Sequence, residues 1–228
     1  MAGALFPVKI IGHIRTDFSS KFGVPRQSGI VDALEARIEF EKEFAQPEAF
    51  RGLEGFSHLW IIWQFSEALR NNWSATVRPP RLGGNTRVGV FATRSPFRPN
   101  AIGLSSVKIQ KIEWDTPKGP VLHVRGADLM DGTPILDIKP YLAYADSHPE
   151  AVDGFAEQTA FQKLNVHFPE PLLAKIPMDK RDALLGVLGE NPAPQYQKDP
   201  ERIYGFGFAG KEVRFRVKDN DLTVVEVE

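Results

Sequence analysis

The amino-acid sequence predicts a mainly β protein, a barrel or sandwich followed by a smaller α+β unit. In the first 150 residues, short strand-like runs recur at roughly regular spacing between Pro- and Gly-rich turns. This spacing is typical of all-β architectures. From about Ala151 the pattern changes, and one clear helix and a meander of three strands follow. We therefore expect two domains, residues 1–150 and residues 151–228.

In the first domain, strands are expected where apolar residues alternate with polar ones or form a short continuous run. Val31–Phe44 fits either an amphipathic helix or a strand, and the alternation within Ala36–Phe40 favours the strand. Gly55–Phe65 is almost continuously apolar, as expected of a strand that is buried on both faces. The other predicted elements are a short helix over Pro47–Leu53 and strands over Pro7–Thr16, Val88–Ala92, Gly103–Trp114, Val121–Gly126 and Ile135–Pro140.

The second domain opens with Ala151–Asn165, which fits either a weak helix or a linker. Met178–Leu188 is a clear short helix that Gly189 ends. Asn191–Pro200 is a proline-rich loop. The predicted strands of this domain are Ile203–Phe208, Glu212–Lys218 and Leu222–Val227.

The stretch Gly83–Ser106 contains a stiff loop. Pro96 and Pro99 exclude a regular helix or a central strand there, because each lacks an N–H and fixes φ. A loop that is already ordered loses little entropy when it binds a ligand. Arg94 and Arg98 lie in this loop with no acidic neighbour in the sequence, so both are available to an external anion.

Charge is distributed unevenly along the chain. The totals are nearly balanced, with 28 basic and 29 acidic residues, yet no Asp or Glu occurs from Ala68 to Ile112. The basic residues of that window are Arg70, Arg78, Arg81, Arg87, Arg94, Arg98, Lys108 and Lys111. A block of one sign attracts polyanions such as nucleic acids. The alternative is that acidic residues from elsewhere fold back onto these arginines.

What the sequence lacks excludes several functional classes. It has no cysteine, which excludes disulfides, thiolate nucleophiles and Cys-based metal sites. It has no nucleophile-elbow, zinc-protease, Walker or Rossmann motif, and its five histidines are scattered. We therefore expect neither covalent nor metal catalysis. No apolar run reaches the ~20 residues that cross a bilayer, and no signal peptide is evident, so a cytoplasmic protein is predicted.

Three polar loops lie at strand boundaries, and one end of a barrel can bring them together. They are Pro25-Arg26-Gln27, the loop with Arg94 and Arg98, and the loop from Asp128 to Asp131. Guanidiniums and carboxylates in one pocket suit a zwitterionic, aromatic small molecule, and the basic block suits a neighbouring nucleic acid. The alternative for the first and third loops is a plain solvated turn.

Several stretches of the chain resemble the TsaA-like family of tRNA methyltransferases, the TrmO type. They occur in the family's order and cover essentially all of residues 5–150. They are VPRQSG at Val24–Gly29, GLEGFSHLWI at Gly52–Ile61, RPPRLGGN at Arg78–Asn85, VGVFATRSPFRPNAIGLS at Val88–Ser105 and DLMDGTPILDIKPYLAYADS at Asp128–Ser147. NPAPQYQ at Asn191–Gln197 and the final strands also look like this family.

The resemblance implies an S-adenosylmethionine-dependent enzyme with a single-sheet β-barrel N-terminal domain and a small α+β C-terminal domain. It implies methylation of the exocyclic nitrogen of threonylcarbamoyladenosine, beside the anticodon of a threonine tRNA. It also implies a homodimer whose active site draws on both subunits. Carried over by motif, the cofactor-binding residues are Pro25, Arg26, Gln27, His58, Leu59, Arg94, Leu104, Asp128, Leu129, Met130 and Asp131.

The chemistry of these residues is compatible with that cofactor. Arg94 suits the methionyl carboxylate, and Asp128 or Asp131 suits the ribose hydroxyls or the methionyl ammonium. The methyl group is already activated on a sulfonium, so the protein must align it and let the acceptor lose a proton. His58 and Asp131 are the candidate bases. The candidate tRNA-binding residues are Arg78, Arg81, Arg87, Arg98 and Tyr196.

Two alternatives stay open, a non-catalytic RNA-binding barrel and a methyltransferase that acts on a non-RNA substrate. The C-terminal loop also departs from the family, which carries an arginine between two prolines in a Pro-Arg-Pro-Ala-Tyr pattern. Here the loop reads Asn191-Pro192-Ala193-Pro194-Gln195-Tyr196. Any contact of that arginine with tRNA or with the threonyl carboxylate is therefore absent from this chain.

Overall fold

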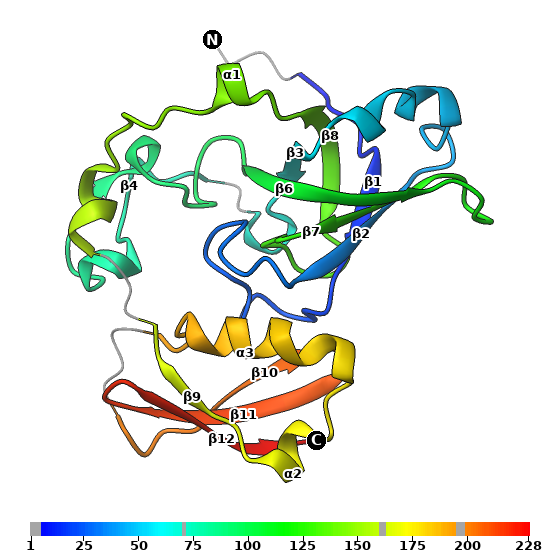
Figure 1. Cartoon of the computed structure of the whole chain (residues 1–228). Helices are drawn as coiled ribbons and strands as arrows, with labels where there is room; N and C mark the ends of the chain where they lie inside the picture. The colour runs from blue at the N-terminus through cyan, green and yellow to red at the C-terminus, as the bar shows by residue number, and fades with distance from the viewer. Residues whose placement is uncertain (1–5, 70–71, 160–162, 195–198) are drawn as a thin grey trace.

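The computed structural model describes residues 6–69, 72–159, 163–194 and 199–228, and it confirms a mainly β fold. A closed barrel forms the upper part of Figure 1, and a four-stranded sheet with helices forms the lower part. The barrel strands are β1 (Gly12–Arg15), β2 (Glu35–Phe40), β3 (His58–Gln64), β6 (Ile102–Glu113), β7 (Val121–Arg125) and β8 (Pro134–Pro140). Their order is β1-β2-β7-β6-β3-β8, and antiparallel pairing of β1 with β8 closes the single sheet.

Strand β3 shows how the barrel is filled. Leu59, Ile61 and Trp63 are buried and point into the core, whereas Trp60 and Ile62 on the opposite face are half-buried. The expectation that this strand is fully buried on both faces is therefore wrong. In a closed barrel only one face of each strand meets the core, and the outer face is covered only where another segment crosses it. The alternation predicted within Ala36–Phe40 is confirmed by β2.

The strand expected over Val88–Ala92 is only partly present. Val88–Gly89 forms β5 and pairs with β4 (Thr76–Val77), but Val90–Ala92 forms the 3-10 turn η5. The turn forms because Val90 is buried and Thr93 Oγ1 donates a hydrogen bond to the Val90 carbonyl oxygen at 2.8 Å. In the described part of the chain, the 3-10 turns that precede it are η1 (Pro47–Phe50), η2 (Leu53–Gly55), η3 (Ser66–Ala68) and η4 (Pro80–Leu82).

The lower unit contains a helix packed on a sheet. Its strands are β9 (Asn165–His167), β10 (Tyr204–Phe208), β11 (Lys211–Lys218) and β12 (Asp221–Val227), in the order β10-β11-β12-β9. Helix α3 (Arg181–Gly189) buries Ala183, Leu184, Val187 and Leu188, and α2 (Glu170–Leu173) precedes it. The predicted helix and three-stranded meander are confirmed. The sequence did not predict β9, which has three residues and pairs with β12 in parallel.

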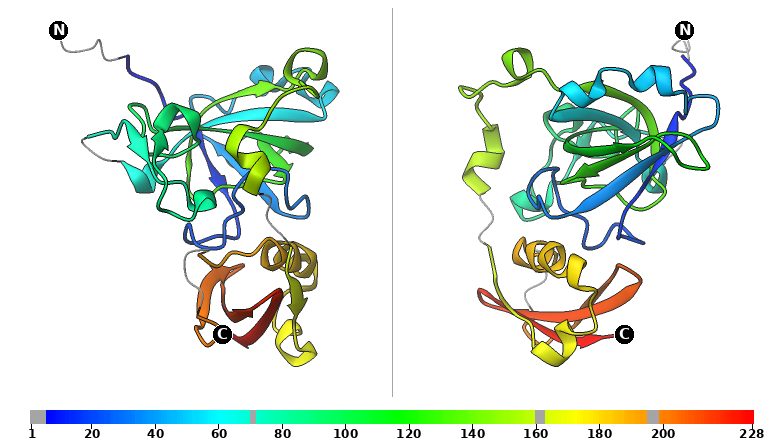
Figure 2. Two further views of the ribbon diagram at one scale, coloured as in Figure 1. Left: turned by 90° about the vertical axis from the view of Figure 1, so that its left-hand side faces the viewer. Right: turned by 45° about the vertical axis from the view of Figure 1, so that its right-hand side comes forward.

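The segment between β1 and β2, residues 16–34, lies at the junction of the barrel and the lower unit in both views of Figure 2. Its Phe18, Val31 and Leu34 are buried in the hydrophobic core of the lower unit. Phe18 also forms a β-bridge with Phe208. We call these residues the β1–β2 segment. The segment connects two strands of the barrel, but its apolar side chains pack in the core of the lower unit.

A strap of residues 141–159 leaves β8 and runs past the barrel toward the lower unit, with α1 (Ala143–Asp146) and η6 (Gly154–Thr159) along it (Figure 1). Asp146 holds its start, because Trp60 Nε1 donates to Asp146 Oδ2 at 3.0 Å. The strap thereby covers part of the outer face of β3. In the part of the chain that the structure describes, no helix has the length and apolar character needed to span a membrane.

Candidate active site

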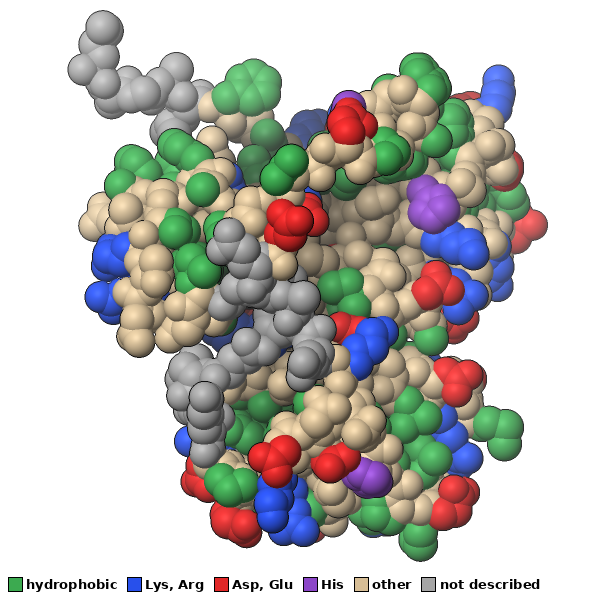
Figure 3. All heavy atoms as spheres, turned by 60° about the vertical axis from the view of Figure 1, so that its left-hand side comes forward, with side chains coloured by type: hydrophobic (Ala, Val, Ile, Leu, Met, Phe, Trp, Pro, Cys, Tyr) green, Lys and Arg blue, Asp and Glu red, His purple; other side chains and the backbone are tan. Residues whose placement is uncertain are grey.

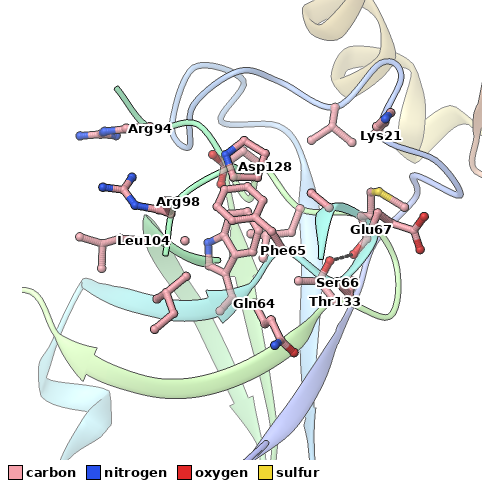
Figure 4. Close-up of a pocket in the computed structure, with 18 of the residues that line it drawn as sticks. Lys21, Gln64, Phe65, Ser66, Glu67, Arg94, Arg98, Leu104, Asp128 and Thr133 are labelled. Atoms are coloured by element: carbon pink, nitrogen blue, oxygen red, sulfur yellow. Dashed lines mark hydrogen bonds between the residues drawn. The ribbon is translucent and has the colours of Figure 1, made fainter. Parts of the chain in front are cut away.

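A cavity of about 720 Å³ opens at the end of the barrel where β3 finishes and β6 begins (Figure 4). Five segments line it: part of the β1–β2 segment, the end of β3 with η3, the stiff loop after η5, the start of β6, and the loop that begins at Asp128. In Figure 4, Arg94 and Arg98 lie on one side of the cavity and Lys21 and Glu67 on the other. The cavity therefore has a strongly cationic side and a mixed side.

The cationic side is held by hydrogen bonds between loops. The Arg94 guanidinium donates to Gln27 Oε1, which joins the stiff loop to the β1–β2 segment. Arg98 Nη1 donates to the Thr93 carbonyl oxygen at 3.2 Å, within its own loop. Among the described residues, no carboxylate forms an ion pair with Arg94 or Arg98. The alternative that acids fold back onto these two arginines is thus not observed in the described part of the chain.

Asp128 lies deep in the cavity, and buried residues hold it. Ser105 Oγ donates to Asp128 Oδ1 at 2.6 Å, and Trp63 Nε1 donates to Ser105 Oγ at 3.0 Å. Burial raises the pKa of Asp128 above its ordinary value, while the Ser105 hydrogen bond and the nearby Arg94 act in the opposite direction. The carboxylate is therefore costly to leave unpaired, and a cationic or hydrogen-bond-donating ligand would relieve that cost.

A basic arm precedes and includes the stiff loop, over residues 72–100. Arg78 and Arg87 are exposed on it, and Arg87 Nε donates to Thr76 Oγ1 at 2.8 Å. Two exposed rings, Trp73 and Phe91, stack with centroids 6.2 Å apart. Figure 3 shows Lys and Arg side chains at the left edge of the upper lobe, where no acidic side chain is visible. This surface combines cationic and aromatic groups.

Comparison with known proteins identifies the family. The model of the tRNA-methyltransferase O N-terminal domain matches residues 13–147, and the model of the TrmO C-terminal domain matches residues 161–228. The chain belongs to the TrmO family. The family resemblance noted in the sequence is thereby confirmed.

Individual relatives agree with that membership. A tRNA (adenine(37)-N6)-methyltransferase of Escherichia coli is 39% identical over 231 residues, which cover 98% of both chains. One of Eikenella corrodens is 44% identical and covers 72% of this chain and 92% of its own. A crystal structure of TrmO has a TM-score of 0.80 at 32% identity and covers 98% of this chain and 99% of its own. A TrmO structure from Pseudomonas aeruginosa also has a TM-score of 0.80, at 31% identity, and covers 99% of this chain and 97% of its own.

Most positions carried over from TrmO relatives by motif meet at the cavity. The ones that line it are Pro25, Arg26, Gln27, Arg94, Leu104, Asp128, Leu129 and Met130. Arg98, considered from the sequence for tRNA binding, lines it too. The loops that contribute them are far apart in the sequence, and barrel closure brings them to one end of the molecule.

His58, Leu59 and Asp131 were also carried over as cofactor-binding residues, and in this chain they do not line the cavity. His58 begins β3, while the end of β3 lines the cavity, and a strand rises ~3.3 Å per residue. Leu59 is fully buried in the barrel core. The carboxylate of Asp131 instead accepts a hydrogen bond from Thr16 N at 3.1 Å and lies 3.7 Å from Arg15 Nη1.

Two of the tRNA candidates lie where the structure gives no side chain to describe. Tyr196 is outside the described residues, and for Arg81 only the backbone, in η4, is described. Ala193, where the TrmO pattern has an arginine, is buried in the core of the lower unit. The small side chain therefore has a packing role in this chain.

Sequence reasoning missed the residues that follow β3. Ser66 and Glu67 line the cavity from η3, and Lys21 lines it from the β1–β2 segment. A signal was available for Glu67, because it is the last acidic residue before the acid-free window and follows an apolar strand. Polar residues at strand ends are common ligand-binding positions.

Proposed function

We propose that this chain transfers a methyl group from S-adenosylmethionine to the N6 nitrogen of adenosine 37 in a tRNA. Family membership makes it a tRNA methyltransferase, and its relative in Escherichia coli, matched over nearly its whole length, carries that activity in its name. The observation that supports the proposal most directly is the cavity, where positions carried over by motif from distant segments converge.

The cavity fits S-adenosylmethionine in size and in chemistry. About 720 Å³ lies within the ~300–1,000 Å³ of typical small-molecule pockets. Leu104 and Phe97 offer apolar surface to the adenine, and Arg94 offers a cation to the methionyl carboxylate. Asp128 accepts hydrogen bonds from the ammonium or the ribose hydroxyls. The bound cofactor supplies a methyl group that is already activated on its sulfonium.

Alignment is the main task that remains for the protein. Methyl transfer would form the carbon–nitrogen bond and break the carbon–sulfur bond of the bound cofactor, and the proton of the acceptor nitrogen would pass to a basic side chain or to water. Within one chain, His58 and Asp131 do not line the cavity, so either could act as the base only on a site shared with the partner subunit. The acids that do line it, among the described residues, are Asp128 and Glu67.

The acceptor that we propose is threonylcarbamoyladenosine in a threonine tRNA. Its threonyl carboxylate would meet Arg98, which brings a positive charge to the cavity. The basic arm supports a nucleic-acid substrate, because Arg78 and Arg87 suit phosphates and the exposed Trp73–Phe91 pair suits unpaired bases. We also propose that the protein is a homodimer and that it acts in the cytoplasm.

Calorimetric titration with S-adenosylmethionine tests the proposal, on the wild type and on Arg94→Ala. We expect micromolar binding by the wild type, a loss of at least about tenfold in the variant, and methylation of modified threonine tRNA by the wild type only. A wild type that binds tRNA in a salt-dependent way, but does not bind the cofactor in titrations with or without tRNA, would support a non-catalytic RNA-binding barrel. Cofactor binding with no methylation of tRNA would support a non-RNA substrate.

A further inference from the structure

Arg26 connects the cavity to the lower unit. It lines the cavity from the β1–β2 segment, and its Nη2 donates to the main-chain oxygen of Asn191 at 3.1 Å. Asn191 is the second residue after α3, at the edge of the lower unit. A cavity arginine is thus held by a backbone carbonyl that lies 165 residues away in the sequence.

The end of α3 is shaped to present that carbonyl. Glu190 N donates to Gly186 O and Asn191 N donates to Leu188 O, both at 3.2 Å, and Asn191 then adopts a left-handed φ of 53°. Gly and Asn are the residues that most readily adopt this conformation after a helix. The carbonyls at a helix C-terminus carry partial negative charge, so they attract a guanidinium.

The β1–β2 segment is fixed to the lower unit along most of its length. Phe18 packs edge-on against Phe208 with ring centroids 5.3 Å apart, and Phe22 packs against Tyr204. Lys180 Nζ donates to Asp17 Oδ2 at 2.8 Å, where both side chains are largely buried. The segment that carries Pro25, Arg26 and Gln27 is therefore supported by the lower unit.

Hydrogen bonds continue from this segment into the barrel loops of the cavity. Gln27 Nε2 donates to the Arg26 carbonyl oxygen at 2.5 Å, and Gln27 Oε1 accepts the hydrogen bond of Arg94. Ser28 Oγ accepts from Ser106 N at 3.1 Å. A continuous set of hydrogen bonds thus runs from Asn191 through the β1–β2 segment to the stiff loop.

We propose that the lower unit is a positioning element for the cofactor cavity, and that the left-handed turn at Asn191 sets the position of Arg26. The inference rests on the proposed function, because it takes the cavity to be the cofactor site. If the lower unit served only to bind tRNA, a change at Asn191 would leave cofactor binding alone. If it positions Arg26, the same change weakens cofactor binding when no tRNA is present.

The test compares three variants, Asn191→Gly, Asn191→Val and Arg26→Ala, by calorimetric titration with S-adenosylmethionine in the absence of tRNA. Both Asn191 variants lack the side-chain amide. They differ in whether the backbone can keep a φ of 53°, which glycine tolerates and valine does not. We expect wild-type affinity for Asn191→Gly and a loss of about five- to tenfold for each of the other two. The double variant Asn191→Val/Arg26→Ala should bind the cofactor no more weakly than Arg26→Ala alone. Once the Arg26 side chain is absent, the turn at Asn191 has nothing left to position.

Thermal unfolding of each variant checks that it folds, and Asn191→Ala replaces Asn191→Val if the latter does not. Independent, multiplicative losses in the double variant would overturn the inference, as would unchanged cofactor affinity in Asn191→Val. Failure of the wild type to bind the cofactor would instead overturn the proposed function and the inference with it. Filter binding of tRNA to the same variants completes the test, because loss of tRNA affinity with unchanged cofactor affinity would assign the lower unit to tRNA binding and overturn the positioning role.

Discussion

Gly103→Ala is the substitution whose effect the structure defines most sharply. Gly103 faces Trp63 across the β3–β6 pair and lines the cavity. A Cβ at this position would come closer than 3 Å to three atoms of the Trp63 indole, which is buried in the barrel core. The indole has to move, and its hydrogen bond to Ser105 Oγ at 3.0 Å is then broken.

The expected cost combines two effects. Overpacking a core costs ~1–3 kcal/mol, and breaking the hydrogen bond of a buried donor costs ~1–3 kcal/mol. Because both effects come from one displacement of the indole, they do not add fully, and we expect a loss of about 2–4 kcal/mol in the free energy of unfolding. For a chain of this size, that corresponds to a fall in Tm of about 5–15 °C. Cofactor affinity should fall too, because Ser105 holds Asp128.

Gly89→Ala is the matched control. Gly89 is exposed in β5, its φ is −58°, and no atom lies within 4 Å of an added Cβ. Its free energy of unfolding should change by no more than ~0.5 kcal/mol. Both variants are measured by urea denaturation and by cofactor titration. If Gly103→Ala unfolds at the same urea concentration as Gly89→Ala, the Trp63–Ser105–Asp128 packing argument is refuted.

Three further predictions concern charge. Burial raises the pKa of Asp128 above 3.8, so ionisation of this group lowers the stability of the fold as the pH rises above that value. Asp128→Asn should therefore have a higher Tm than the wild type at pH 7 and the same Tm at about pH 3. Equal Tm values at both pH values would contradict this prediction. Hydrogen bonds from Lys118, Arg37 and Arg15 lower the pKa of Glu39 from 4.5 to about 2, so its stabilisation is present above pH 4.5 and is lost as the pH falls toward 2. Glu39→Gln should therefore be less stable than the wild type at pH 7, with the difference closing by about pH 2 in a series of thermal melts. The double variant Arg78→Ala/Arg87→Ala should bind tRNA more weakly than the wild type. The slope of log affinity against log salt concentration should fall by ~1 for each phosphate that is no longer neutralised, as measured by filter binding at several salt concentrations. An unchanged slope would show that neither residue contacts the tRNA.

Local patterns in the sequence predicted the strands and much of the site. Alternation within Ala36–Phe40 and the two prolines of the stiff loop act within a few residues, so they report directly on local structure. The loops that follow strands were expected at one barrel end, and those around Arg94 and Asp128 do meet at the cavity. These parts depend only on short-range physics and on barrel closure.

What could not be predicted depends on the direction of strands and on packing between distant segments. Nothing in the sequence says which end of β3 faces the cavity, so Glu67 after its end was not predicted as a lining residue. Val90 looked like a strand residue, but its burial and the Thr93 hydrogen bond make a turn. Similarly, Phe18 and Phe22 gave no sign that their partners lie in β10, because no periodicity connects residues at such a separation.

The packing of the β1–β2 segment on β10 also orders events during synthesis. Phe18 leaves the ribosome well before its partner Phe208 is made. At ~5–20 residues per second, translation takes tens of seconds to supply that partner. Throughout this interval the nascent barrel carries an uncovered aromatic loop between its first two strands. The loop that later forms one wall of the cavity is therefore exposed to aggregation and to proteases until the lower unit has been made.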